Sequence, residues 1–400
     1  STGRLVHQKG SMMETPKSLG IGMIGYGGIG RVHAMGYRDL SFHYGLPAGA
    51  VQLIGVATTR AETAEKAALE IGCPVWTGDY RDLLERDDIQ VVDVCVPNDR
   101  HEEIVLAAAA AGKHIYCEKP LALDPAQAKR MAAAVEAAGV KAQVTFNFRF
   151  VPAVLRARQL LDEGFAGRVF SFRSWYFRSS YISPQRPLTW RFSREVSGGG
   201  ALFDLGSHLL DLICFLLGDV DQVRAMLETR IPERPLAGDP SRMGKVEVDD
   251  LAFLHMRLAG DAPGTAEISR LATGATNDFE LEIFGESGAI RLSLTDPNWL
   301  HIYDVRAGDK PLGGRRGYTR VETIQRFDGA LAPDWTQPMS FVRSHAECQY
   351  QFLKAIWEDR RPRTDFWDGV RVQEILEAAQ VSARENRWAD VARSAGVERK

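Results

Sequence analysis

The stretch "LGIGMIGYGGIGRVHA", residues 19–34, decides the fold of the first half of the chain. A short apolar run leads directly into "GYGGIG", in which Gly25, Gly27 and Gly30 have the GxGxxG spacing. The first glycine permits a tight turn, the second lets backbone approach a pyrophosphate, and the third lets the next helix pack close to the strand. A helix beginning near Arg31 would present free N–H groups and the positive end of its dipole to phosphates. The alternative is a merely tight glycine turn.

The surrounding sequence favours the dinucleotide-binding interpretation, because apolar runs alternate with helical stretches up to about residue 147. Strands are predicted at 21–24, 51–57, 91–96, 114–116 and 142–146. Helices are predicted in "AETAEKAALEIG" (61–72), "HEEIVLAAAAAGK" (101–113) and "DPAQAKRMAAAVEAAG" (124–139). Nearly continuous apolar strands between helices indicate a parallel sheet covered on both faces. We therefore expect an α/β Rossmann dinucleotide-binding domain over residues 18–147.

The pattern changes in the second half. After a predicted helix at 152–163, strand-like runs follow in series at 167–182, 220–231, 248–258, 265–272, 278–284 and 289–294. Strands without intervening helices predict an α+β domain with a large, mostly antiparallel open sheet. We expect this domain, residues 148–400, to bind substrate and to mediate homo-oligomerisation as a dimer or tetramer. Predicted helices at 340–358 and 368–386 can pack back on the first domain, and residues 1–17 are expected to be a leader outside the fold.

The amino-acid composition limits the kinds of binding partner that can be expected. The 400 residues carry 49 Lys and Arg against 52 Asp and Glu, so there is no global charge that favours nucleic acid or an anionic membrane. No apolar run reaches the roughly 18 residues of a membrane span. The five cysteines are scattered without a CxxC pair, which is typical of reduced thiols in a cytoplasmic protein.

The stretch "YCEKPLAL", residues 116–123, places a charged pair directly after a predicted buried strand. A solvated loop is the simple interpretation. Parallel strands, however, end at the crevice where ligands bind, so Glu118 and Lys119 would face a ligand there. Pro120 fixes the backbone behind Lys119 and can adopt the cis form.

The stretch "GGGALFDLGSHLLDLICFLLG", residues 198–218, is predicted to form one helix that follows its three leading glycines and has a buried leucine stripe. Asp204 and His208 lie one turn apart on another face, together with Ser207 and Asp211, and can point into one cleft. The alternative is a histidine bonded to a nearby carbonyl. An Asp-x-x-x-His pair could also hold a metal, but a site needs three or more ligands. No other cluster has suitable spacing, so no metal is predicted.

The end of the second predicted strand bears on cofactor choice. It reads "ATTR", where an acid would grip the ribose of NAD, and no acid appears before Glu62. Thr58 and Thr59 can offer hydroxyl groups, and Arg60 can lie against an adenine or a 2′-phosphate. This favours NADP or dual use over NAD alone, unless Arg60 simply opens the next helix.

In their order, GxGxxG at 25–30, "EKP" at 118–120 and "DLGSH" at 204–208 resemble the glucose–fructose oxidoreductase, inositol dehydrogenase and MocA-like (Gfo/Idh/MocA) family. "VPNDRH" at 96–101 and "GGG" at 198–200 fit the same pattern. The resemblance implies that Lys119 touches the nicotinamide ribose and the reacting alcohol, His208 is the acid/base, and Asp204 binds substrate. The predicted cofactor-binding set is Gly25, Gly27, Gly28, Ile29, Gly30, Thr58, Thr59, Arg60, Pro97, Asn98, His101, Glu118, Lys119, Asn147, Trp190 and Arg191.

The resemblance implies an NAD- or NADP-dependent oxidoreductase that moves hydride between a nicotinamide and a secondary alcohol of a sugar or polyol, an anhydrosugar or an inositol. His208, with an ordinary pKa of about 6.5, can accept the hydroxyl proton, and Lys119 can stabilise alkoxide charge or join a proton relay. The aromatic residues Trp175, Tyr176, Tyr181 and Trp190 can stack on a sugar ring or simply pack. Two other functions remain: a glycoside hydrolase working by transient oxidation and elimination, and a non-catalytic sugar and dinucleotide sensor.

Overall fold

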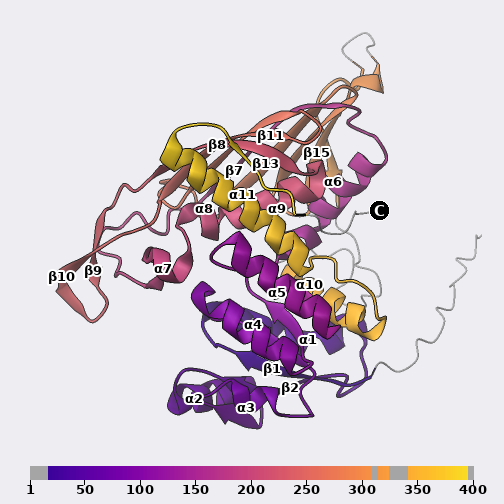
Figure 1. Cartoon of the computed structure of the whole chain (residues 1–400). Coiled ribbons are helices and arrows are strands. Elements are labelled where there is room, and N and C mark those ends of the chain that lie inside the picture. Colours follow the sequence, from indigo (N-terminus) through magenta and orange to yellow (C-terminus); the bar gives the residue numbers. More distant parts are fainter. Residues whose placement is uncertain (1–16, 309–313, 324–340, 395–400) are drawn as a thin grey trace, which may run out of the picture.

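The computed structural model describes residues 17–308, 314–323 and 341–394, and it shows two domains, one above the other in Figure 1. Nearly all of the expected leader, residues 1–16, lies outside the described part of the chain.

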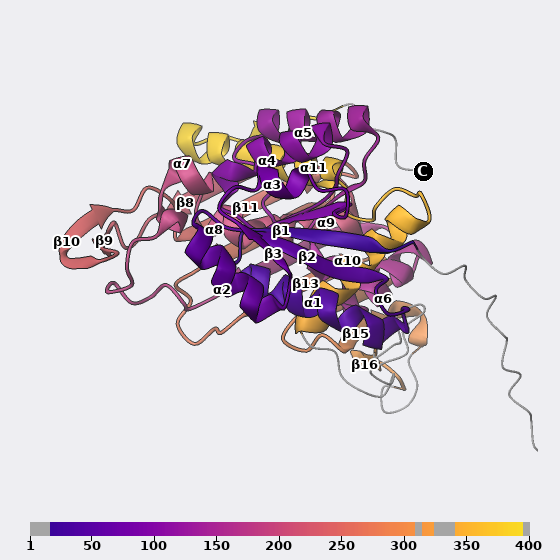
Figure 2. The same cartoon turned by 90° about the horizontal axis from the view of Figure 1, so that it is seen from below.

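The first domain is built on a six-stranded parallel sheet of order β3-β2-β1-β4-β5-β6. Helices α4 and α5 lie on one side of this sheet and α1 and α2 on the other (Figure 2). The elements are β1 (Leu19–Ile24), α1 (Gly28–Tyr44), β2 (Val51–Ala57), α2 (Ala61–Ile71), β3 (Val75–Thr77), α3 (Arg81–Leu84), β4 (Val91–Val94), α4 (His101–Ala110), β5 (His114–Cys117), α5 (Pro125–Ala138) and β6 (Ala142–Val144). This confirms the predicted Rossmann fold; the short β3 and α3 were not predicted.

Local sequence signals explain where α5 begins and ends and why the chain turns after β1. Asp124 caps α5 by accepting the N–H of Gln127 at 2.8 Å, and Pro125 occupies the first turn, where its missing N–H costs nothing. Gly139 ends the same helix in the left-handed conformation. After β1, Gly25 has φ of 90°, and a Cβ there would lie 2.5 Å from the carbonyl oxygen of Cys95. Only glycine fits this turn.

The second domain holds a nine-stranded sheet of order β16-β15-β14-β13-β7-β12-β11-β8-β17. Its strands are β7 (Val169–Phe177), β8 (Val220–Glu228), β11 (Leu251–Leu258), β12 (Pro263–Ser269), β13 (Asp278–Gly285), β14 (Gly288–Ser293), β15 (Trp299–Asp304), β16 (Thr319–Glu322) and β17 (Ala389–Asp390). Among the described strands of this sheet only β12 and β7 pair in parallel, so the predicted mostly antiparallel sheet is confirmed. β15, β16, β17 and the separate hairpin of β9 (Glu233–Leu236) and β10 (Asp239–Lys245) were not predicted.

One face of the large sheet is covered by α6 (Pro152–Asp162), α8 (Ala201–Asp204), α9 (Gly206–Leu217) and α11 (Phe366–Glu385), whereas no described helix covers the other face (Figure 1). The C-terminal helices also reach the first domain, because α10 (Phe341–Trp357) packs on α1 and α11 packs on α5. The rings of Tyr44 and Tyr350 stack between α1 and α10 with centroids 3.4 Å apart.

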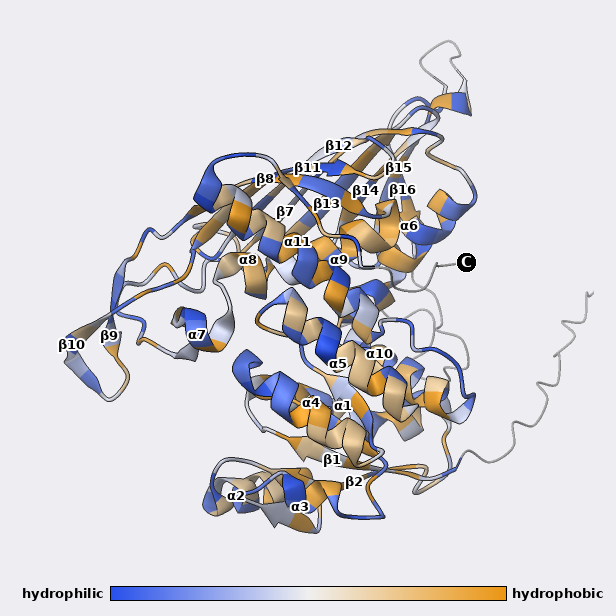
Figure 3. Ribbon diagram, viewed as in Figure 1, coloured by the Kyte–Doolittle hydropathy of each residue, from blue (hydrophilic) through white to orange (hydrophobic). Residues whose placement is uncertain are grey.

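The prediction of a single helix after the glycines at 198–200 is wrong in one respect: α8 ends at Asp204, α9 begins at Gly206, and the segments 194–204 and 206–217 are bent by 52°. The predicted leucine stripe is buried, but so are most other residues of the hydrophobic α9 (Figure 3), with Phe215 and Leu217 partly exposed. Asp211 therefore does not face the cleft with His208; it pairs with the buried Arg149. Among the described helices none alone is long and apolar enough to cross a membrane, and only the bent pair 194–204 and 206–217 meets that test by length and composition.

Candidate active site

A cavity of about 910 Å³ opens where the glycine turn after β1 meets α8 and α9 of the second domain. Residues from both domains line it. Its dinucleotide end is lined by Gly25, Gly27, Gly28, Ile29, Thr58, Thr59, Arg60, Asp79, Arg81, Pro97 and Asn98. Its substrate end is lined by Glu118, Lys119, Thr145, Asn147, Phe148, Tyr176, Arg178, Tyr181, Arg186, Trp190, Arg191, Asp204 and His208.

The glycine turn presents bare backbone to the cavity. A Cβ added at Gly27 or Gly28 would meet no atom within 4 Å, so the space beside this backbone is open. Gly27 is also the N-cap of α1, with no side chain bonded to the helix's first N–H groups. Free N–H groups at the positive end of a helix fit a pyrophosphate. Gly30 does not line the cavity; a Cβ there would lie 2.9 Å from the oxygen of Gly25, in keeping with close packing of strand and helix.

The end of β2 lines the cavity without an acid. Thr58 Oγ1 donates to the carbonyl of Arg60 at 2.9 Å, which shapes the turn into α2. Arg60 is exposed at the cavity and forms no ion pair within the described residues. Sequence reasoning missed Asp79 and Arg81, which line the same end and pair with each other at 3.2 Å. No motif marks them, because they reach the site through the unpredicted loop after β3.

The loop after β4 supplies some, but not all, of the cavity residues that the sequence predicted. Pro97 and Asn98 line the cavity, and Asn98 Nδ2 donates to the carbonyl of Ser197 in the second domain at 2.9 Å. The structure does not bring His101 there. Its ring nitrogens lie 3.1 Å from the carbonyls of Leu121 and Val96, and the side chain is fully buried. His101 begins α4 and turns inward, so it holds the loops together instead of facing a cofactor.

Lys119 and Asp204 meet across the two domains. Lys119 Nζ donates to Asp204 Oδ1 at 3.2 Å and to the Asp204 carbonyl at 3.1 Å. Arg270 donates to Oδ2 of the same carboxylate at 3.0 Å, and Arg191 lies 3.5 Å from Oδ1. Burial alone would raise the pKa of Asp204, but Lys119 and the arginines hold it well below the usual range. The ionised carboxylate thus anchors Lys119, whose peptide bond to Pro120 is cis.

His208 lies beside this pair in a largely apolar setting. Its ring stacks on Phe148 with centroids 4.3 Å apart, and its Nδ1 is buried without a hydrogen-bond partner in the described residues. No hydrogen bond joins Asp204 to His208 among the described residues; the carboxylate of Asp204 is bonded to Lys119, Arg270 and Arg191 instead. Burial, followed by the charge of Lys119, lowers the pKa of His208 well below its ordinary value of 6.5. His208 is therefore a neutral imidazole at physiological pH, free to accept a proton.

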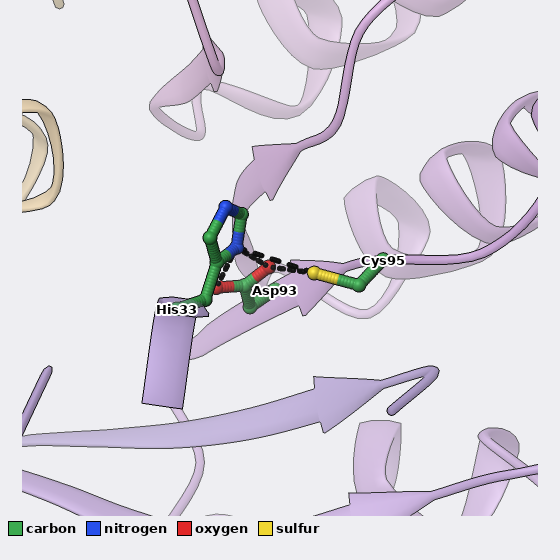
Figure 4. Close-up of side chains that lie close together, drawn as sticks. All are labelled: His33, Asp93 and Cys95. Atoms are coloured by element: carbon green, nitrogen blue, oxygen red, sulfur yellow. Dashed lines mark hydrogen bonds and ion pairs between the residues drawn. The ribbon is translucent and has the colours of Figure 1, made fainter. Parts of the chain in front are cut away.

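Glu118 faces away from bulk water into a buried network. Its Oε1 lies 3.2 Å from His33 Nε2 and accepts the Thr145 hydroxyl at 2.7 Å. On its other side His33 Nδ1 lies 3.0 Å from Asp93, and Cys95 donates to Asp93 at 3.1 Å (Figure 4). Burial alone would lower the pKa of His33, but Asp93 and Cys95 raise it well above the usual value. An imidazolium between two carboxylates results.

His33, Asp93 and Cys95 have the composition of a metal site, which the sequence did not predict. Their ligand atoms lie 3.0 to 3.2 Å apart, at hydrogen-bond distances, and the three side chains satisfy one another. We interpret them as a network behind the cavity that holds Glu118 in place.

The substrate end gathers aromatic and cationic side chains. Tyr176, Tyr181 and Trp190 line the cavity, whereas Trp175 does not, since its Nε1 donates to Asp278 on neighbouring β13. Asn147 lines the cavity and donates to Ser344 at 3.1 Å. Sequence reasoning missed Arg178 and Arg186, because an alternating strand and a proline-rich loop carry no signal for a site.

An open glycine turn for a pyrophosphate, and a lysine and a neutral histidine in the same cavity, define a dinucleotide-dependent oxidoreductase. The sequence profile of the "Oxidoreductase family, NAD-binding Rossmann fold" matches residues 19–146, and that of the "GFO/IDH/MocA C-terminal domain" matches residues 154–291. The chain therefore belongs to the Gfo/Idh/MocA oxidoreductase family, as its motifs predicted.

Its relatives include levoglucosan dehydrogenase of Pseudarthrobacter phenanthrenivorans, 35% identical over 94% of this chain and 98% of the relative. Inositol 2-dehydrogenase of Rhizobium meliloti is 26% identical over 93% of this chain and 98% of its own length. Among solved structures, a complex of levoglucosan dehydrogenase with NADH and levoglucosan superposes with a TM-score of 0.88 at 35% identity, covering 94% of this chain and 100% of that one. An oxidoreductase domain protein from Kribbella flavida gives a TM-score of 0.88 at 36% identity over the same shares.

Proposed function

We propose that this protein oxidises a secondary hydroxyl group of a sugar, anhydrosugar or inositol with a nicotinamide dinucleotide. The main observation behind this proposal is that Lys119 and the neutral His208 line the same cavity as the open glycine turn. The names of relatives support the substrate class, since they include levoglucosan dehydrogenase and inositol 2-dehydrogenase.

The chain's own residues divide the work of binding the cofactor. The backbone at Gly27 and Gly28 would receive the pyrophosphate, and Thr58, Thr59 and Arg60 would border the adenosine ribose. Pro97 and Asn98 would lie along the nicotinamide half. When bound, the nicotinamide takes up hydride from the substrate carbon.

Proton transfer is the task of the substrate end. As hydride leaves the carbon, the hydroxyl group must lose its proton, and His208 can accept it because its imidazole is neutral. Lys119 Nζ, held by Asp204, can donate a hydrogen bond to the same oxygen and stabilise its developing negative charge. Asp204 thereby fixes the direction of the ammonium group and balances its charge while the site is empty of substrate.

The hydrolytic alternative is not favoured, because the named relatives are dehydrogenases. A sugar and inositol panel with NAD and with NADP, followed by absorbance of the reduced nicotinamide, tests the proposal. We expect net reduction with at least one member. Release of a leaving group without net reduction would contradict it.

We also propose that the uncovered face of the nine-stranded sheet mediates a homo-oligomer. None of the helices that the structure describes lies over this face, and Phe170 and Met226, on strands β7 and β8, are about half exposed. Exposed apolar side chains on an open sheet favour self-association. Sedimentation should give a dimer or tetramer, and Met226→Glu with Phe170→Glu should shift it toward monomer; an unmodified protein that sediments as a monomer contradicts this proposal.

A further inference from the structure

The substrate end of the cavity carries more positive charge than proton transfer requires. Lys119 and Arg191 line it beside Asp204, and Arg270 contacts the same carboxylate from behind. Arg178 and Arg186 line it as well, and neither forms an ion pair within the described residues. The other carboxylate of this end, Glu118, is already paired with His33. Five cations thus face one available carboxylate.

The two extra arginines are held in place by the protein. Arg178 donates through Nε to Asn277 at 2.7 Å, which leaves its terminal nitrogens uncommitted to that bond. Arg186 donates through Nη1 to the Ser180 carbonyl at 3.0 Å, and its guanidinium lies 4.2 Å from the centroid of the Tyr181 ring. Its Nε is buried without a partner in the described residues. Groups fixed in this way lose little freedom on binding a ligand.

A second layer of arginine supports this arrangement. Arg270 lies 4.7 Å from the centroid of the Tyr181 ring, so two guanidiniums pack on one ring. Arg234 is fully buried and donates to the carbonyls of Tyr181 and Ser183 at 2.8 Å, which fixes the loop that carries Arg186. Asp250 offsets part of the charge of Arg234, and Asp204 and Asp249 offset that of Arg270. This second layer therefore positions the loop, while Arg178 and Arg186 keep their charge for a ligand.

The glycine turn that fits a pyrophosphate follows β1 of the first domain, whereas Arg178 and Arg186 follow β7 of the second domain, so we assign the two arginines to the substrate and not to the dinucleotide phosphates. A neutral sugar would leave their charge unbalanced. A guanidinium fork matches the paired oxygens of a carboxylate or phosphate.

We propose that the natural substrate bears an anionic substituent, a carboxylate or a phosphate, which Arg178 and Arg186 bind while Lys119 and His208 act on a ring hydroxyl. This inference rests on the proposed function for the identity of the reacting group, and it adds the charge class of the substrate.

The test measures binding separately from turnover. Calorimetry would compare glucose, glucuronate and glucose 6-phosphate added to the complex of the protein with NADH. We expect at least one anion to bind about tenfold or more tightly than glucose, with an advantage that shrinks as salt rises. Preference for glucuronate identifies a sugar acid and preference for glucose 6-phosphate a sugar phosphate. Equal affinity for all three overturns the proposal.

Variants assign the effect to the arginines. Arg178→Gln and Arg186→Gln should each reduce the ratio of anion to glucose affinity, and Arg178→Lys should restore part of it. The matched control is Arg173→Gln on β7, the strand that precedes Arg178; its side chain pairs with Glu282 and does not line the cavity, and the change should leave the ratio unchanged. If Arg178→Gln and Arg186→Gln weaken NADH binding as much as anion binding, the arginines serve the cofactor and the proposal is wrong. Tight anion binding without any nicotinamide reduction would instead contradict the proposed function.

Discussion

The dinucleotide end and the substrate end of the cavity are built from different parts of the chain. The first uses backbone, with Gly27 and Gly28 leaving open space beside the first turn of α1. The second uses charged side chains from segments that are far apart in the sequence. Lys119 lies 85 residues before Asp204, and Arg270 lies 66 residues after it. A backbone site is encoded in a few consecutive residues, whereas a side-chain site depends on how distant segments pack. The first end is therefore suited to a shared cofactor and the second to a particular substrate.

The largest effects should come from the two proton-handling groups at the substrate end. Lys119→Ala and His208→Ala should each lower kcat by about 10² to 10⁴-fold, because each removes a positioned acid–base or charge-stabilising group. The affinity for NADH should change little, since the glycine turn is untouched. Rapid-mixing measurement of nicotinamide reduction and fluorescence titration of NADH would separate the two quantities. Lys129→Ala, at a lysine outside the cavity, serves as the control, and near-unmodified turnover in either active-site variant would refute the assignment.

The next prediction concerns the network behind Glu118. His33→Ala would leave the carboxylates of Asp93 and Glu118 buried without their shared cation. Breaking a buried ion pair typically costs about 3 kcal/mol or more of unfolding free energy. Urea denaturation would measure the loss, with Glu65→Ala at an exposed position of α2 as control. A loss below about 1 kcal/mol would mean that the pair contributes no more than a surface contact.

The dinucleotide end and the substrate end also differ in how much of each could be predicted from the sequence. GxGxxG and the apolar strands predicted the parallel sheet and the open turn, because both are local patterns. The position of Lys119 after β5 was also predictable, since parallel strands end at the ligand crevice. The pairing of Asp204 with Lys119, and not with His208, was not predictable, because Lys119 lies 85 residues earlier in the chain, in the other domain. His33, Arg178 and Arg186 gave no signal, for their roles depend on long-range packing.

The pH dependence of activity and of stability at acid pH should show that His208 titrates differently from an exposed histidine. Because its pKa in the folded protein is well below 6.5, the imidazole stays neutral as pH falls through that value. The acid limb of kcat/KM due to His208 should therefore lie below pH 6.5. The unfolded chain binds a proton near pH 6.5 and the folded one does not, so the unfolding free energy of the unmodified protein should fall relative to that of His208→Gln as pH drops below 6.5. A constant difference between the two proteins would contradict the lowered pKa.

The smallest effect is expected at the dinucleotide end. Arg60 lies at the cavity without an ion pair in the described residues, where a 2′-phosphate would add charge. Arg60→Ala should weaken NADP binding a few-fold more than NAD binding, since an exposed charge contact contributes about 1 kcal/mol or less. Fluorescence titration with both reduced dinucleotides gives the ratio. Equal losses for both, or a strong preference of the unmodified protein for NAD, would remove the argument that Arg60 recognises a phosphate.

The central claim is that the ammonium group of Lys119 and the imidazole of His208, from different domains, act on one substrate oxygen. A crystal structure of the protein with NADH and a sugar that it oxidises tests this directly. The account predicts both nitrogens at about 3 Å from the same sugar oxygen, with the carbon bearing that oxygen against the nicotinamide ring. A sugar oxygen contacted by neither group, or a His208 ring still closed against Phe148 and away from the ligand, would contradict it.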